Sequence, residues 1–165
     1  MKFKFFICAT LIHFSSFCQS KNETQDWIKE KLQGLSYTAE DSKGGYVKHT
    51  YRVSFNDCKM DLTEVLDTYI SGVSVLVTFI TEIPIKDLAK LNFTNTDNGV
   101  TFFFRTKTSD NIKETVVELN KTTFISEKEY RFNKSAQNDN LPTRLTKAFN
   151  NLVKLCGGQV TKEVF

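Results

Sequence analysis

The feature that most constrains this chain is a pair of apolar segments on either side of Asn98-Gly99. The first, residues 73–80, is the longest apolar run outside the N-terminal segment, and the second is residues 100–105. Both are rich in β-branched and aromatic residues, which suit a pleated, half-buried surface. One face of the first segment carries Val73, Val75, Val77 and Phe79, and one face of the second carries Val100, Phe102 and Phe104. We therefore expect two buried strands around which the rest of the chain packs, with a helix over part of the second face.

The first 18 residues have the layout of a secretory signal peptide. A basic start at residues 1–4 precedes a short apolar stretch at residues 5–12. Ser16-Phe17-Cys18 then places small residues at the two positions that a signal peptidase recognises. We expect cleavage before Gln19, and export to the periplasm or the medium.

Two alternatives to cleavage remain. A membrane anchor would need about 20 apolar residues, but His13, Ser15 and Ser16 interrupt the run. A lipid anchor on Cys18 is the other possibility, although Phe17 is bulkier than the small residue that normally precedes a lipidated cysteine.

The charge of the mature chain excludes some classes of partner. Removal of residues 1–18 deletes Lys2 and Lys4 and no acidic residue, so the net charge falls from +3 to about +1. Nucleic acids and anionic membranes both attract clustered lysine and arginine, and the chain has no such cluster. Residues 19–165 suffice for one domain with a real core, and we expect a monomer without a further membrane span.

Two cysteines, Cys58 and Cys156, remain after signal cleavage. An even number of cysteines in an exported chain permits a disulfide. The alternative is two buried thiols that never meet. We predict the bridge, with Cα atoms within about 4.4–6.8 Å of each other.

The pattern along the chain predicts an α+β fold. A short helix is expected at residues 23–32, and a strand with one wet face at residues 47–55, where apolar and polar residues alternate. Asn56-Asp57 turns the chain into a strand at 58–62. The remaining elements are a polar loop at 92–98, short strands at 114–119, 122–126 and 129–132, and an amphipathic helix at 141–156. We expect five to seven antiparallel strands in a curved sheet or partly open barrel, with the C-terminal helix packed on it.

The residue inventory argues against catalysis. His49, the single histidine of the mature chain, lies on the apolar side of the best-patterned strand, where a core or rim role is expected. Two distant cysteines and one histidine do not make a zinc site, and the glycine pairs fit no phosphate-binding loop. The acidic residues form no distinctive pair. We therefore expect no enzyme, no catalytic residues, no metal and no cofactor.

Residues 73–80, Ile83-Pro-Ile-Lys-Asp-Leu88, residues 100–105 and the final helix together resemble the strand pattern of pleckstrin-homology-like (PH-like) domains. The resemblance implies a partly open barrel and no particular ligand. The family's basic phosphoinositide loop has no counterpart, because Asn56-Asp57 joins the first two strands here. Residues 141–158 also resemble the end of small uncharacterised exported proteins of Gram-negative bacteria. This resemblance implies no particular activity.

Two functional hypotheses follow. The first is a non-enzymatic exported module that binds a protein or peptide at the cell envelope, through a sheet edge or a helix-flanked groove. The second is a carrier of a small apolar ligand or lipid inside the curved sheet, lined by Phe79, Phe102 and Phe104. A cavity above about 300 Å³ would favour the carrier. A packed interior with an exposed apolar patch would favour the binding module, which is our preferred hypothesis.

Overall fold

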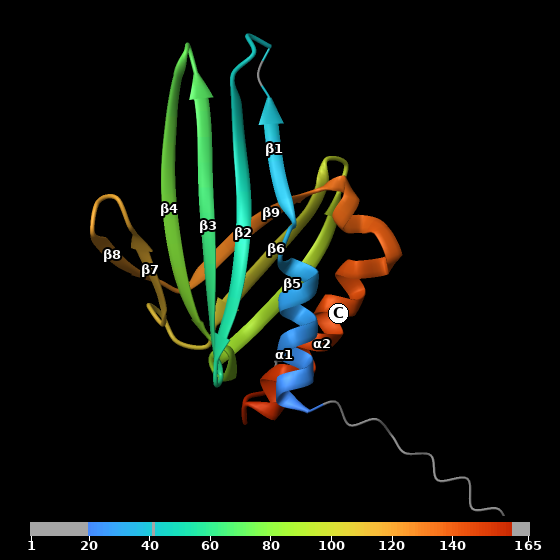
Figure 1. The fold of residues 1–165 in the computed structure, drawn as a ribbon. Helices are drawn as coiled ribbons and strands as arrows, with labels where there is room; N and C mark the ends of the chain where they lie inside the picture. The colour runs from blue at the N-terminus through green and yellow to red at the C-terminus, as the bar shows by residue number, and fades with distance from the viewer. Residues whose placement is uncertain (1–19, 41, 160–165) are drawn as a thin grey trace, which may run out of the picture.

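The computed structural model describes residues 20–40 and 42–159, which form two helices and nine strands (Figure 1). The expected signal peptide lies outside these residues. The helices are α1 (Lys21–Leu32) and α2 (Leu141–Leu155), with two 3₁₀ segments, η1 (Ile85–Asp87) and η2 (Lys134–Asn140). The strands are β1 (Ser36–Glu40), β2 (Tyr46–Asn56), β3 (Lys59–Ile70), β4 (Val73–Pro84), β5 (Leu88–Thr96), β6 (Gly99–Thr106), β7 (Ile112–Val116), β8 (Lys121–Ile125) and β9 (Glu127–Asn133).

The strands form two antiparallel sheets that do not close into a barrel. The large sheet has the order β1-β2-β3-β4-β7-β8, and the small sheet has the order β5-β6-β9. The small sheet crosses one half of the large sheet, and the other halves of β2, β3 and β4 extend beyond it (Figure 1). We call residues 66–77, the end of β3 and the start of β4, the projecting hairpin.

The core lies where the two sheets and the helices meet. Phe93 and Phe102 stack with ring centroids 4.2 Å apart, and the ring centroid of Phe149 in α2 lies 5.4 Å from that of Phe102. Helix α2 packs on β5 and on α1, and it buries Leu145, Phe149, Leu152 and Val153. The apolar stripe of the final helix therefore serves the core, as its spacing predicts.

Local sequence explains where the two helices begin. Ser20 and Glu23 form a capping box at the start of α1, in which each side chain accepts the other residue's backbone N–H. Pro142 occupies the first turn of α2, where a missing N–H costs nothing. The predicted C-terminal helix and the α+β class are both confirmed.

Some predicted elements were wrong in extent. The described residues form nine strands instead of five to seven, since β1 and β5 were not predicted. Residues 64–70 extend β3 without adding a strand. The expected polar loop at 92–98 is largely the second half of β5. Leu91 and Phe93 face the core there, whereas Asn92 and Thr94 face solvent. These polar residues thus form the solvent-exposed face of a strand.

The prediction that residues 73–80 lie at the centre of the core was also wrong. Val73 and Leu76 are 61% and 58% exposed, and β4 becomes fully buried only near Thr81 and Ile83. The β-branched residues do form a strand. Its first half, however, extends past the small sheet and both helices, so nothing in the described chain covers it.

Candidate functional site

One side of β4 is paired over only part of its length. β3 pairs with all of β4, but β7 pairs only with residues 79–82. At the end of that ladder, the Val117 N–H donates to the Thr78 carbonyl over 2.9 Å. The Val117 carbonyl instead accepts the Asn120 N–H within the following turn, at 3.1 Å. The chain therefore leaves the edge of β4 at Val117.

Beyond this point the backbone of β4 is open to solvent on one side. Backbone groups of alternate residues in a strand point to the same edge. Ser74 and Leu76 therefore direct their N–H and C=O groups to the side on which Thr78 meets β7. Within residues 20–40 and 42–159, no strand pairs with them there. We call residues 73–77 of β4 the free edge.

Apolar side chains line one face of the sheet at the free edge, and on the other face Leu76 lies beside Ser74, whose hydroxyl donates to Asp67 over 3.2 Å. The register places Val73 opposite Ile70 and Val75 opposite Thr68 on one face, and Leu76 opposite Asp67 on the other. Ile70, Val73, Val75 and Leu76 are each more than half exposed. Residues 70–77 contain no charged residue. Proteins usually protect an exposed edge with charge, proline or a covering element, so this one is unusual.

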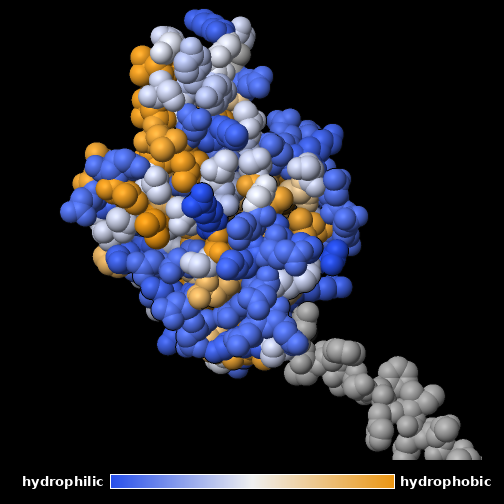
Figure 2. All heavy atoms as spheres, in the orientation of Figure 1, coloured by the Kyte–Doolittle hydropathy of each residue, from blue (hydrophilic) through white to orange (hydrophobic). Residues whose placement is uncertain are grey.

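The turn between β7 and β8 adds to this surface. Leu119 is 71% exposed, and Val117 and Phe124 are also exposed. Figure 2 shows hydrophobic residues along the projecting part of the large sheet and again on the left-hand lobe, where Figure 1 places β7 and β8. On the inner face, an apolar depression of about 180 Å³ adjoins the hairpin tip and is lined by residues that include Val47 and Ile70.

A polar pair marks the base of the projecting hairpin. His49 Nδ1 lies 2.7 Å from a carboxylate oxygen of Glu64, which is only 8% exposed. Tyr51, opposite Glu64 in β2, donates its hydroxyl to the Arg131 carbonyl over 2.9 Å. Burial and the nearby Glu64 charge raise the pKa of Tyr51. His49 thus has the satisfied rim position that its strand pattern favours, and its partner Glu64 gave no signal in the sequence.

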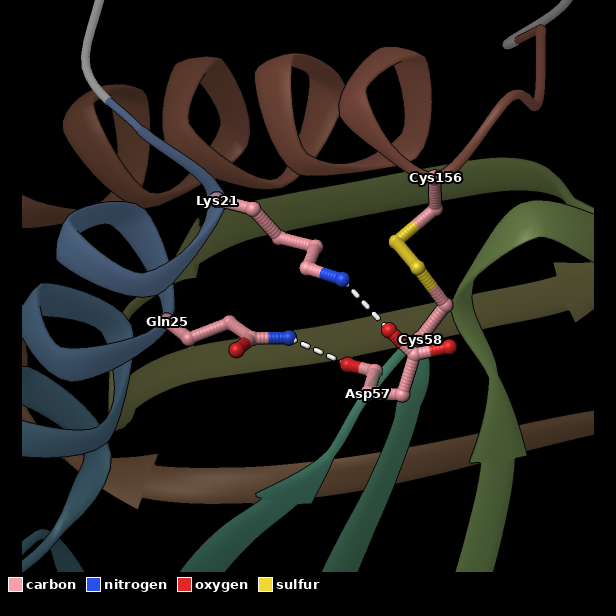
Figure 3. Close-up of a disulfide and its surroundings, with 5 residues drawn as sticks. All are labelled: Lys21, Gln25, Asp57, Cys58 and Cys156. Carbon is pink, nitrogen blue, oxygen red and sulfur yellow. Dashed lines mark hydrogen bonds and ion pairs between the residues drawn. A yellow bond between two sulfur atoms is a disulfide. The ribbon is translucent and has the colours of Figure 1, made fainter.

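The predicted disulfide is present at the opposite end of the large sheet (Figure 3). Cys58 and Cys156 are bonded, with Cα atoms 5.7 Å apart. Beside them, the side chains of Lys21 and Gln25 bind Asp57 in the β2–β3 turn. Both helices are therefore attached to this turn, one by the disulfide and the other by polar contacts.

The three phenylalanines expected to line a ligand cavity occupy different environments. Phe102 and Phe104 are fully buried, and their ring centroids lie 5.3 Å apart. Both rings also lie against other aromatic rings. Phe79 is half-buried on β4 beside β7, and the Lys128 ammonium group lies 5.4 Å from its ring centroid. The space around Phe102 and Phe104 is filled by Phe93, Phe149 and Tyr130.

None of three comparisons, with family models, curated proteins and solved structures, found a match.

Within the described part of the chain, no group of three or more His, Cys, Asp or Glu side chains is arranged to hold a metal ion. Neither described helix is long and apolar enough to cross a membrane. The free edge is therefore the candidate functional site, because unpaired backbone groups and exposed apolar side chains coincide there.

Proposed function

We propose that this protein is a non-enzymatic exported module that binds an extended segment of a partner protein by strand addition at the free edge of β4. The observation that carries the proposal is that Ser74 and Leu76 lie directly in line with β7 and that no strand of the described chain pairs with their backbone groups on that side. An added strand would satisfy their backbone groups. Its side chains would pack beside Val75 on one face and Leu76 on the other, as cross-strand neighbours do.

The same backbone groups argue against a lipid bilayer as the partner. The apolar side chains of the projecting hairpin would be stable in hydrocarbon. Unpaired N–H and C=O groups would not, because each costs several kcal/mol when no hydrogen-bond partner is present. A peptide strand supplies both the apolar contact and the missing hydrogen bonds, whereas a bilayer core supplies only the first.

Export is the second part of the proposal. The basic and apolar N-terminal sequence favours secretion. The Cys58–Cys156 bridge supports an oxidising compartment, since structural disulfides persist there and are rare in reducing ones. An exported location would also bring the free edge into contact with envelope or extracellular proteins.

The carrier hypothesis receives less support. Its ligand would have to occupy the space beside Phe102 and Phe104, and aromatic rings of the protein already fill that space. The exposed apolar patch at the projecting hairpin favours a macromolecular partner instead.

A crosslinking experiment followed by amide exchange tests the proposal. Benzophenone-alanine in place of Leu76, expressed in the native host, would trap the partner, and the same substitution at the exposed Thr94 of β5 serves as control. The partner is then purified and mixed with protein that lacks benzophenone-alanine. Hydrogen exchange of that protein's amides is measured by NMR. We expect the Ser74 and Leu76 amides to exchange fast alone and slowly in the complex. A complex in which both amides still exchange fast would exclude strand addition.

A further inference from the structure

We infer that the free edge receives the amino terminus of its partner, in a strand antiparallel to β4, with the α-amino group of that strand against the Glu118 carboxylate. The inference rests on the proposed function and adds a direction and a chemical end group to it.

Geometry limits how a strand can lie on the free edge. β7 runs antiparallel to β4 and follows its edge only as far as Val117. Beyond Val117, no strand of the described chain lies beside β4 on this side, and the end of β7, from which the β7–β8 turn departs, occupies the lower end of this line along β4 (Figure 1). A partner strand on this line cannot continue past the turn. It must therefore begin there if it is antiparallel to β4, or end there if it is parallel.

Glu118 distinguishes between these two directions. Its carboxylate accepts the Thr78 N–H with both oxygens, at 2.9 and 2.8 Å, so the group is held at the closed end of the line. Backbone hydrogen bonds from Thr78 and from Glu118 itself lower the pKa of this carboxyl group, which keeps it ionised. No described lysine or arginine forms an ion pair with Glu118.

The charge of Glu118 favours a strand that begins at this point. Each carboxylate oxygen can accept a further hydrogen bond. The ammonium group at the start of an antiparallel strand would donate to this carboxylate, in a charge-assisted bond. The carboxylate at the end of a parallel strand would meet a like charge. An internal segment would have to bend away from the β7–β8 turn and would gain nothing from Glu118.

The chemistry of the first residues of the partner follows from the two faces. From Val77 to Ser74, the free edge can pair with about four residues of an added strand. The exposed neighbours are Val75 on one face and Leu76 with Ser74 on the other, and residues 70–77 carry no charge. Apolar or β-branched residues are therefore favoured on both faces of the bound segment. The partner class is a protein with a free, apolar amino-terminal strand.

A peptide titration separates this inference from the proposed function. The probe is the hexapeptide Val-Thr-Val-Thr-Val-Thr, amidated at its C-terminus, with either a free or an acetylated amino terminus. Chemical shifts of the Ser74 and Leu76 amides in the mature chain report binding. We expect the free amine to bind about two- to fivefold more tightly than the acetylated form, as for an exposed ion pair.

Variants of the protein assign that difference to Glu118. The difference should disappear in Glu118→Gln and persist in Glu30→Gln, an exposed carboxylate on α1 that leaves the free edge unchanged. A spin label at the C-terminus of the peptide should broaden the Gly72 signal and leave Leu119 sharp. This readout of direction does not depend on the stability of any variant.

The possible results are distinct. Equal binding of the two peptides at Ser74 and Leu76, or a spin label that broadens Leu119, would overturn the inference and leave strand addition in place. No shift of Ser74 and Leu76 with either peptide would overturn the proposed function together with the inference.

Discussion

The hydroxyl group of Tyr130 donates a hydrogen bond to the hydroxyl group of Thr81, at 2.7 Å, in the space between the two sheets. Tyr130 belongs to β9 of the small sheet and Thr81 to β4 of the large one. Both residues are almost fully buried. The bond therefore joins the sheets where β4 passes from the exposed free edge to the core.

Replacement of Tyr130 by Phe should destabilise the protein by about 1–3 kcal/mol, because it leaves the buried Thr81 hydroxyl without this partner. Urea unfolding of the variant measures the loss. Thr81→Val in the same background removes the other partner, so the double variant should lose less than the sum of the two single losses. Strictly additive losses would mean that the hydrogen bond contributes nothing.

Stability should also fall at alkaline pH. Burial raises the pKa of Tyr130 well above its ordinary value, and burial with the Glu64 charge does the same for Tyr51. Above about pH 10 these side chains ionise in the unfolded chain but stay neutral in the folded one, so the unfolded state binds fewer protons. Each tyrosine should then lower the free energy of unfolding by about 1.4 kcal/mol per pH unit.

The Tyr130→Phe variant isolates this effect from the titration of lysines. It lacks one of the two raised groups, so the stability gap between wild type and variant should narrow as the pH rises above 10. Urea melts at several alkaline pH values measure that gap. A gap that stays constant would show that Tyr130 ionises equally well in the folded protein.

The sequence predicted best those features that depend on local periodicity or on simple counting. The apolar spacing of Leu145, Phe149 and Leu152 identified the final helix and its buried face. The pairing of Cys58 with Cys156 was predicted from the expected export and an even cysteine count, and the bridge is present. Phe102 and Phe104 were correctly placed on a strand, and both are fully buried.

The candidate site could not be predicted, because it depends on where other elements stop. Val73 and Ile83 have the same character and the same strand face, yet one is exposed and the other buried. The difference arises from the reach of the small sheet across β4, which no local pattern records. The contact of Glu118 with Thr78 likewise joins residues 40 positions apart, and only the tertiary structure brings them together.

Reduction of the Cys58–Cys156 bridge should destabilise the protein by about 2–4 kcal/mol, because the bridge restricts a long loop in the unfolded chain. It also releases the end of α2 from the β2–β3 turn. Urea melts with and without dithiothreitol measure the cost, and Cys58→Ala with Cys156→Ala should reproduce it. Thiol labelling of unfolded, unreduced protein that lacks residues 1–18 should find neither cysteine free. Two labelled thiols would contradict the bridge.

The last prediction compares two residues on one face of β4. Ile83 is fully buried, so Ile83→Ala should cost about 2–5 kcal/mol through lost contacts and a cavity. Val75 is 51% exposed, so Val75→Ala should change stability by less than about 0.5 kcal/mol. The same variant should nevertheless weaken partner binding, because it truncates an apolar side chain of the free edge. Urea melts and binding measurements on both variants separate the two effects. A large loss of stability in Val75→Ala would mean that the projecting hairpin is packed and that β4 has no free edge to offer.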